Sequence, residues 1–471
     1  MWRIRSWYGT AMLTALLIAA AAVPAQRPVS FLLVITDDQR NDMLGCAGHP
    51  ILQTPEMDAL AARGTRFENA FVTTPICAAS RASILASRYE ANHGFTFGTP
   101  PIPSALTEDS WPVRLRGAGW RTGHIGKWGM KTEENARGLY DTFIPTGAPY
   151  FKKAKDGTVQ HLTNITGDHA LAFLDELDEE QPFALTISFN APHADDPNPL
   201  QYVWAEEEDE LYGDVDIPLP DLATEDAFAA LPPFLQSAMG RKRWGWRFDS
   251  EEKRVRMTRG YYRMISGIDR NLGRVMRRLD ELERTGDTVV IFLGDNGYFL
   301  GERGLAGKWL IYEESIRVPM IVIDPRTKED ARRPTTPEAV LNIDVGPTIM
   351  DLAGFEVPKG YQGMSLAPLL SGQPTEWRNE FLVEHHMDNA IIPKHRGLRG
   401  ERWVYSLFYE QSPPYEQLFD LENDPQQLQN LAGVAAHEDK LIELRERTTA
   451  TADRLASGLN KPAESPVDDK R

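Results

Sequence analysis

The chain has only two cysteines, Cys46 and Cys77, in 471 residues. A small disulfide-rich fold is excluded, because two cysteines can form at most one bridge. Basic residues are also scarce, since 51 Lys and Arg stand against 68 Asp and Glu, giving a formal net charge of −17. This balance argues against nucleic acid or an anionic membrane surface as the main partner. An anionic substrate would therefore need a local positive site.

No apolar run of membrane-spanning length follows the N-terminal segment. In that segment Arg3 and Arg5 precede an apolar stretch over residues 11–23, which is itself too short for a comfortable span. Small residues before Gln26 suit cleavage. The pattern predicts a signal peptide over residues 1–25. We expect a secreted or periplasmic protein with no membrane span in the mature chain.

Two apolar runs end in oxygen-bearing side chains. Residues 29–36 lead into Asp37 and Asp38, and residues 288–293 lead, after Gly294, into Asp295 and Asn296. Such runs are typical of strands buried on both faces of a parallel sheet. At a single strand end, a turn or capping pair is an equally good interpretation. Two such ends favour a metal site, and ligands that offer only oxygen suit Ca²⁺ or Mg²⁺ rather than zinc.

The segment over residues 73–85 contains Cys77 followed by small residues and Arg81. Pro75 is a plausible helix starter, and helical spacing places Cys77 and Arg81 on one face. Free N–H groups at a helix start attract anions. Cys77 is thus expected where a nucleophile would meet an anionic substrate. The alternative is a buried structural cysteine beside a surface arginine.

Three further polar residues follow predicted strands or loops. Lys127 ends a strand after Gly119, and His193 follows a strand over residues 183–188. Lys308 lies in a glycine-flanked loop. The C-terminal edge of an open α/β sheet is where ligands bind. The alternative is that the lysines are merely solvated and the histidine is structural.

The remaining pattern predicts a large α/β domain over residues 26–375 and a smaller domain over residues 376–471. Helices are expected over residues 55–63, 111–117, 168–177, 258–282 and 344–353, and another strand over residues 320–323. Residues 195–250 show no clean period and indicate a long insertion that lines or covers a pocket. Strands over residues 403–409 and 417–420 suit an antiparallel sheet, and residues 438–455 suit a closing helix.

Taken together, these motifs resemble a type I, formylglycine-dependent sulfatase of the alkaline-phosphatase-like superfamily, over residues 29–432. The matching residues are Asp37-Asp38, Cys77 to Arg81, Gly126-Lys127-Trp128, Pro192-His193, Asp295-Asn296-Gly297, Gly307-Lys308, and the segments 312–319 and 418–425. The resemblance implies a large, mainly parallel sheet flanked by helices, with a smaller C-terminal antiparallel-sheet domain. It also implies that a maturation enzyme oxidises Cys77 to formylglycine, whose hydrate attacks a sulfate ester.

The resemblance also implies a role for each site residue. One Ca²⁺ would be held by Asp37, Asp38, Asp295, Asn296 and the modified Cys77. Arg81 would stabilise the hydrate and sulfate oxygens, Lys127 and Lys308 would neutralise the transferring group, and His193 would assist the leaving alcohol. These cations supply the local positive site that an acidic chain needs.

Two positions depart from the family pattern. Ala79 replaces the commoner proline, a variant that the family tolerates. Gly129 stands where many sulfatases carry a histidine that helps to expel sulfate. Alternation along a strand would place His124 on the face opposite residues 125, 127 and 129, so it is a poor substitute. We expect another group, or water, to act as the base.

By analogy with exported sulfatases, the expected substrate is a sulfated carbohydrate. His93, His385, His386 and Arg399 are candidates for contacting the sugar, although each could equally be an ordinary surface group. A phosphate or phosphonate ester hydrolase of the same superfamily is the main alternative. A sulfated-glycan-binding protein is a further alternative if Cys77 stays unmodified.

Overall fold

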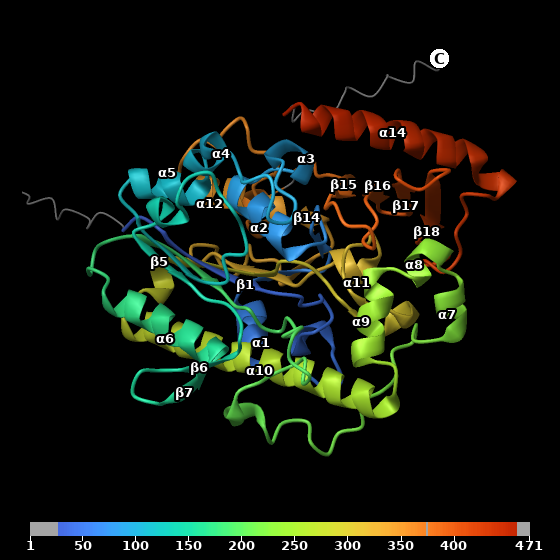
Figure 1. The fold of residues 1–471 in the computed structure, drawn as a ribbon. Helices are drawn as coiled ribbons and strands as arrows, with labels where there is room; N and C mark the ends of the chain where they lie inside the picture. The colour runs from blue at the N-terminus through green and yellow to red at the C-terminus, as the bar shows by residue number, and fades with distance from the viewer. Residues whose placement is uncertain (1–26, 374, 459–471) are drawn as a thin grey trace, which may run out of the picture.

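Strand β1 (Ser30–Thr36) lies between β8 (Phe183–Ser188) and β9 (Thr288–Gly294) and is parallel to both. A computed structural model describes residues 27–373 and 375–458 (Figure 1). The predicted signal peptide lies outside these residues. None of the helices in the described ranges has the length and apolarity needed to span a membrane.

The main sheet of the described residues has eight strands in the order β13-β2-β12-β9-β1-β8-β4-β5. The outer members are β2 (Thr65–Phe67), β4 (Arg121–Gly126), β5 (Thr142–Pro145), β12 (Met320–Ile323) and β13 (Thr335–Thr336). All pairings are parallel except those of β12, which is antiparallel to β9 and β2. The expected mainly parallel sheet is confirmed. An apolar run looks the same in either direction, so its sequence could not reveal the reversal of β12.

Helices cover both faces of this sheet. Figure 1 shows α1 (Pro55–Arg63), α6 (Leu162–Asp175) and α10 (Glu251–Glu281) on one face, and α2 (Cys77–Ala86), α5 (Trp111–Gly117) and α12 (Val345–Leu352) on the other. Alternate residues of β1 pack against the two layers of helices. Leu32 and Val34 pack with α1, α6 and α10, and Phe31 and Leu33 pack with α2, α5 and α12. Both faces of β1 are therefore buried, as its unbroken apolar run predicts.

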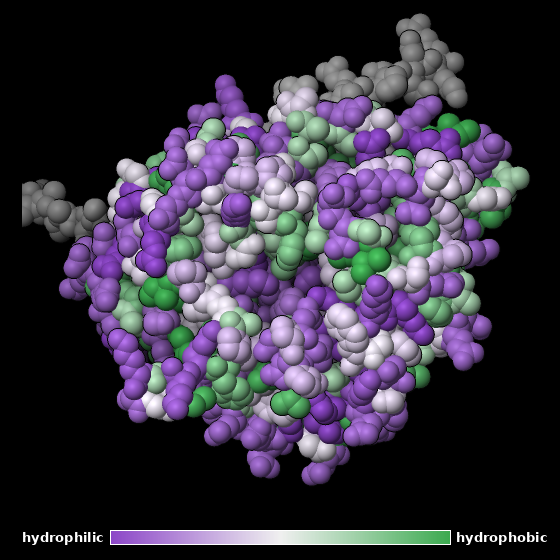
Figure 2. Space-filling model, in the orientation of Figure 1, coloured by the Kyte–Doolittle hydropathy of each residue, from purple (hydrophilic) through white to green (hydrophobic). Residues whose placement is uncertain are grey.

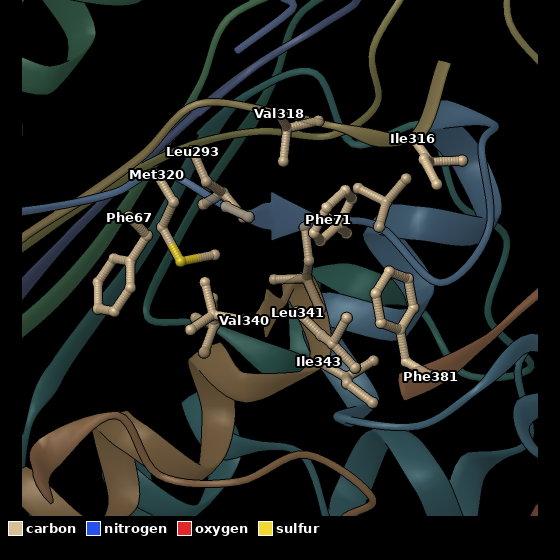
Figure 3. Packing of buried hydrophobic residues seen from close by; sticks show 14 of the residues in the cluster. Phe67, Phe71, Leu293, Ile316, Val318, Met320, Val340, Leu341, Ile343 and Phe381 are labelled. Atoms are coloured by element: carbon tan, nitrogen blue, oxygen red, sulfur yellow. The ribbon is translucent and has the colours of Figure 1, made fainter. Parts of the chain in front are cut away.

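The C-terminal sheet is antiparallel, as predicted. It comprises β15 (Glu380–His385), β16 (His395–Gly400), β17 (Trp403–Phe408) and β18 (Tyr415–Asp420), with α14 (Glu438–Ala456) packed against it. Figure 3 shows Phe381 of β15 in one apolar cluster with Phe71, Leu293 and Ile343. The two sheets thus share a core, and a domain boundary between residues 375 and 376 stays a prediction.

The remaining elements are short. The strands are β3 (Ala70–Phe71), β6 (Phe151–Lys153), β7 (Val159–His161), β10 (Phe299–Leu300), β11 (Ala306–Gly307) and β14 (Val340–Leu341). The helices are α3 (Glu90–His93), α4 (Ser104–Glu108), α7 (Glu225–Ala229), α8 (Pro233–Gln236), α9 (Met239–Arg247), α11 (Glu313–Ile316) and α13 (Ala367–Leu370). Three of these helices, α7 to α9, lie in the insertion that shows no period in sequence.

Several predicted boundaries shift for identifiable reasons. Helix α2 begins at Cys77 rather than at Pro75, because Ile76 is extended (φ −150°, ψ 130°). Helix α6 begins earlier than expected, since the His161 side chain accepts a hydrogen bond from the Thr163 amide and caps it. Ser250 caps α10 in the same way and extends that helix toward its N-terminus.

Candidate active site

The ends of β1 and β9 bring four oxygen-bearing side chains together. Asp37, Asp38, Asp295 and Asn296 are all at most 1% exposed. The backbone fixes their positions: the Asp295 amide donates to the Thr36 carbonyl oxygen at 2.9 Å, and the Asp38 amide donates to Oδ1 of Asp295 at 3.2 Å. The predicted meeting of two strand ends is therefore what the fold produces.

Three oxygens of this cluster have no hydrogen-bond partner among the described residues. They are Oδ1 of Asp37, Oδ2 of Asp38 and Oδ1 of Asn296, and all three are buried. Buried polar atoms are normally paired, so three orphaned oxygens at one place call for a cation. Asp37, Cys77 and Asp295 also offer ligand atoms within 4.8 Å of one another, as do Asp37, Asp38 and His193. The donor set fits a hard divalent cation.

Two lysines lie against these carboxylates. Lys127, which follows β4, forms an ion pair with Asp37, and Lys308, which follows β11, forms one with Asp38. Burial alone would raise the pKa of Asp37, but Lys127 together with His193 and Lys308 holds it well below its usual range. Burial, and then the charge of Asp37, raise the pKa of Asp295 to about 7. The site therefore concentrates charge of both signs.

Cys77 is the first residue of α2 and is buried. Burial raises the pKa of its thiol, although Lys127 and Lys308 oppose that shift. An unmodified Cys77 is thus a protonated thiol at neutral pH and a weak nucleophile, since the thiolate is the reactive form. Its place at a helix start beside two ammonium groups suits an anionic substrate.

Arg81 is one turn further along α2 and is also buried. Its Nε atom donates to Oδ2 of Asp295 at 2.7 Å, and Nη1 donates to the Lys127 carbonyl oxygen at 3.0 Å and to Ser188. Its Nη2 atom is buried and has no partner among the described residues. Arg81 is therefore fixed on one side and keeps an unused donor. Sequence reasoning missed Ser188, although its place as the last residue of a buried strand was a usable signal.

His193 lies beside the carboxylates with a defined ring orientation. Its Nδ1 atom is 2.6 Å from the Ala194 carbonyl oxygen, which makes Nδ1 the donor and leaves Nε2 3.6 Å from Oδ2 of Asp38. Tyr150 holds the loop by donating to the His193 carbonyl oxygen at 2.6 Å. Burial lowers the pKa of His193 to about 4, although Asp37 and Asp38 oppose the shift.

His124 lies apart from the carboxylates, packed among Trp128, Tyr140 and Phe143, with ring centroids 4.9 to 5.7 Å away. Our reason for excluding it was wrong in one respect. Strand β4 ends at Gly126, where φ is +107°, so strict alternation does not extend to residues 127 and 129. A side chain at Gly129 would have its Cβ 3.5 Å from both Arg81 and Lys127, so this position does border the site.

The four candidates for sugar contact are engaged within the protein. His93 is buried with Nε2 3.0 Å from Ser83 Oγ, and His385 is fully buried beside His395. His386 contacts Glu384 and Tyr409, while Arg399 pairs with Glu313 and stacks on Phe71. His93 and His385 are therefore closed to solvent and unavailable to a sugar. A contact of His386 or Arg399 with the sugar stays a prediction.

Comparison with known proteins agrees with this geometry. A sequence model of the sulfatase family matches residues 30–355, and one of the C-terminal part of N-sulphoglucosamine sulphohydrolase matches residues 301–454. The chain is 27% identical to an N-acetylglucosamine-6-O-sulfatase of Bacteroides thetaiotaomicron, over 92% of this chain and 88% of that protein. It is 30% identical to a choline-sulfatase of Rhizobium meliloti, over 85% and 82%.

The fold agrees as well. A solved structure, in complex with its substrate D-glucosamine-2-N,6-O-disulfate, superposes with a TM-score of 0.76 at 24% identity, covering 94% of this chain and all of that one. The family model extends from the first strand of the main sheet past the whole of the carboxylate cluster. The chain therefore belongs to the sulfatases, the sulfuric ester hydrolases of the alkaline-phosphatase-like superfamily.

Proposed function

We propose that this sulfatase removes sulfate from a sulfated carbohydrate, using one calcium ion and a formylglycine made from Cys77. Two comparisons support a sugar substrate: the N-acetylglucosamine-6-O-sulfatase relative and the fold neighbour in complex with a disulfated glucosamine. The signal peptide predicted over residues 1–25 supports secretion or export to the periplasm, where sulfated polysaccharides would be met.

The observation that carries the proposal is the set of orphaned oxygens beside Cys77. Asp37, Asp38, Asp295 and Asn296 would hold the calcium ion together with residue 77. The ion would supply positive charge that polarises the nucleophile and a sulfate oxygen. Asp37 and Asp38 pair with the ammonium groups of Lys127 and Lys308. This supports a site in which positive and negative side chains alternate.

The proposal assigns the nucleophile to residue 77. A formylglycine hydrate there, made by a maturation enzyme, would supply a hydroxyl nucleophile that the buried thiol cannot provide. Arg81 has its Nη2 atom unpaired and can donate to this hydroxyl or to a sulfate oxygen. Lys127 and Lys308 can shift from their carboxylates to neutralise charge that develops on the transferring group.

The proposal gives His193 the task of assisting the leaving alcohol. Its Nδ1 hydrogen is committed to the Ala194 carbonyl oxygen, so Nε2 is the atom that faces the charged groups. Bound sulfate would add negative charge beside the ring and favour its protonated form. In that form His193 could donate a proton to the bridging oxygen as the ester bond breaks.

A screen of sulfated mono- and oligosaccharides tests the proposal, with release of sulfate as the readout and Cys77→Ala as the inactive control. Matched phosphate and phosphonate esters belong in the same screen. Activity confined to aryl or steroid sulfates would contradict the carbohydrate assignment. Faster cleavage of phosphate or phosphonate esters would favour the alternative hydrolase. Binding without turnover, with a free thiol at position 77, would favour a glycan-binding protein.

A further inference from the structure

An ion triad outside the calcium cluster borders the proposed active site. Asp196 follows His193 in the same loop, and Arg243 and Arg247 lie one turn apart on one face of α9. Arg243 Nη2 pairs with Oδ2 of Asp196, and Arg247 Nη2 pairs with Oδ1. Two cations thus share one carboxylate, which leaves an excess positive charge.

The two arginines are bound very differently. Arg247 is fully buried, and its other nitrogens donate to Gln201 Oε1 at 2.8 Å and to the Tyr298 hydroxyl. Each of its three nitrogens therefore has a partner inside the protein. Arg247 can neutralise Asp196 by itself, so the carboxylate does not require Arg243.

Arg243 has unused donor capacity. Within the described residues Asp196 is its hydrogen-bond partner, and its buried Nε atom has none. Its guanidinium carbon lies 4.9 Å from the ring centroid of Trp309, and its side chain is 12% exposed. A guanidinium has five N–H donors, so Arg243 keeps donors that Asp196 does not use.

Trp309 holds this platform next to the chemistry. It directly follows Lys308, its amide donates to the Pro75 carbonyl oxygen at 3.0 Å, and its φ of +82° is rare for a residue with a side chain. A Cβ at Gly307 would lie 2.6 Å from the Trp309 ring, so the ring packs closely on that glycine. The guanidinium of Arg243 therefore rests on a ring that is tied to the segment entering α2.

The triad is electrically coupled to the site. Burial alone would raise the pKa of Asp196, but Arg243 and Arg247 lower it, and His193 and Lys308 add to the lowering. Figure 2 shows a hollow with hydrophilic residues at its floor in the face on which α2, α9 and α11 lie. A substrate group beyond the reacting sulfate would therefore meet positive charge on the α9 side.

We propose that Arg243 binds a second anionic group of the substrate, a sulfate or a carboxylate carried by the sugar whose ester is cleaved. This inference rests on the proposed function. A planar guanidinium suits an oxyanion, and stacking on Trp309 reduces the entropy lost on binding. A sugar with no second anion would leave the excess positive charge of the triad uncompensated. The favoured substrate class is thus a sugar with at least two negative groups.

The test compares kcat/KM for N-acetylglucosamine 6-sulfate with three esters that carry a second anion. These are glucosamine-2-N,6-O-disulfate, N-acetylglucosamine 3,6-disulfate and a uronate-linked disaccharide bearing the 6-sulfate, so sulfate and carboxylate are distinguished. A lost charge-assisted contact corresponds to roughly a 10- to 100-fold change. We expect wild type to favour at least one of the three by that factor, and Arg243→Gln to bring the ratio close to one.

Lys242→Gln is the matched control, because it removes the same charge from the exposed neighbouring position of α9 and should keep the wild-type ratio. Arg247 remains with Asp196 in Arg243→Gln, which should preserve folding. If Arg243→Gln does not fold, the wild-type ratios of kcat/KM still show whether a second anion on the sugar is favoured. Equal kcat/KM for all four esters, or a preference that survives Arg243→Gln, would overturn this inference alone. Turnover of none of them by an enzyme whose activity is confined to aryl or steroid sulfates would contradict the proposed function as well.

Discussion

The Nε atom of Arg81 lies 2.7 Å from Oδ2 of Asp295, and both side chains are buried. The pair joins α2, which begins with Cys77, to the end of β9. A buried ion pair is stable while both partners remain, and removing one leaves an uncompensated charge. Arg81 thus has a structural role alongside its proposed contact with sulfate.

Arg81→Ala should lower the free energy of unfolding by about 3–5 kcal/mol, the usual cost of breaking a buried pair. Added calcium should recover part of this loss, because it would compensate the charge of Asp295. Denaturant unfolding with and without calcium measures both effects. Arg114→Ala is the control, since its pair with Asp109 is exposed and should be worth at most about 1 kcal/mol. A similar cost for the two variants would contradict the argument.

Asp295→Asn should abolish calcium binding and turnover together, because it removes a negative ligand while keeping the shape of the side chain. Calorimetric titration with Ca²⁺ and sulfate release measure the two effects. Asp42→Asn, whose carboxylate pairs with Arg40 and is 47% exposed, is the control and should retain both. In wild type, chelation should stop turnover and calcium should restore it. An unchanged rate after chelation would limit the cluster to a structural role.

Cys77 should be converted to formylglycine in an expression host that has the maturation enzyme. The peptide containing residue 77 should be lighter by about 18 Da than its cysteine form, the difference between thiol and aldehyde at this nucleophile position. Mass spectrometry measures the shift. Cys77→Ala should be inactive and folded, and Cys46→Ala should remain active. Active protein with an intact thiol at position 77 would refute the proposal.

The cluster of buried oxygens was predictable from the sequence because its residues follow apolar strands. Asp37 and Asp295 come directly after runs long enough to identify as buried strands, and parallel strand ends meet at one edge. The family resemblance added Lys127 and Lys308, which single-residue reasoning left open. Local sequence patterns were therefore sufficient to predict the site residues that follow the end of a regular strand.

The same reasoning could not find the ion triad. Asp196 and Arg243 lie in a stretch without hydrophobic period, and their meeting depends on how short helices pack. The burial of two sugar-contact candidates was missed for a related reason. His93 lies in α3, which packs against the C-terminal sheet, and His385 lies in β15 of that sheet, so their burial is decided by tertiary packing rather than by spacing.

Asp269 should make stability depend on pH. Burial raises its pKa to about 7, although its carboxylate accepts hydrogen bonds from the amides of Glu56 and Met57. Because the folded pKa exceeds the usual value of 3.8 for an aspartic acid, folding favours the protonated form. Its contribution to stability is present below about pH 4 and is lost as pH rises toward 7.

The asparagine side chain of Asp269→Asn does not titrate. The free energy of unfolding of this variant, relative to that of wild type, should therefore rise between pH 4.5 and pH 8. Urea unfolding of both proteins at the two pH values measures the difference. Asp280→Asn is the control for net charge, because Asp280 is exposed on the same helix. A difference between wild type and Asp269→Asn that is constant with pH would show that this carboxyl has no raised pKa.

His193 and His124 should respond very differently to substitution. His193→Ala should slow turnover by roughly 10²–10⁴-fold, the range expected for a lost general acid. His124→Ala should cost little turnover, because that ring lies among Trp128, Tyr140 and Phe143 and its Nε2 atom is 3.3 Å from the Lys127 carbonyl oxygen. Gly129 stands where many sulfatases carry a histidine, and we expect another group or water to serve as the base.

The comparison requires steady-state kinetics on a sugar sulfate, since an activated aryl sulfate needs little help with its leaving group. On an aryl sulfate the effect of His193→Ala should therefore shrink, which distinguishes a leaving-group role from a structural one. Thermal unfolding of both variants checks that the fold is retained. A large loss of turnover in a folded His124→Ala protein would mean that His124 acts on the site through Lys127, against the packing described here.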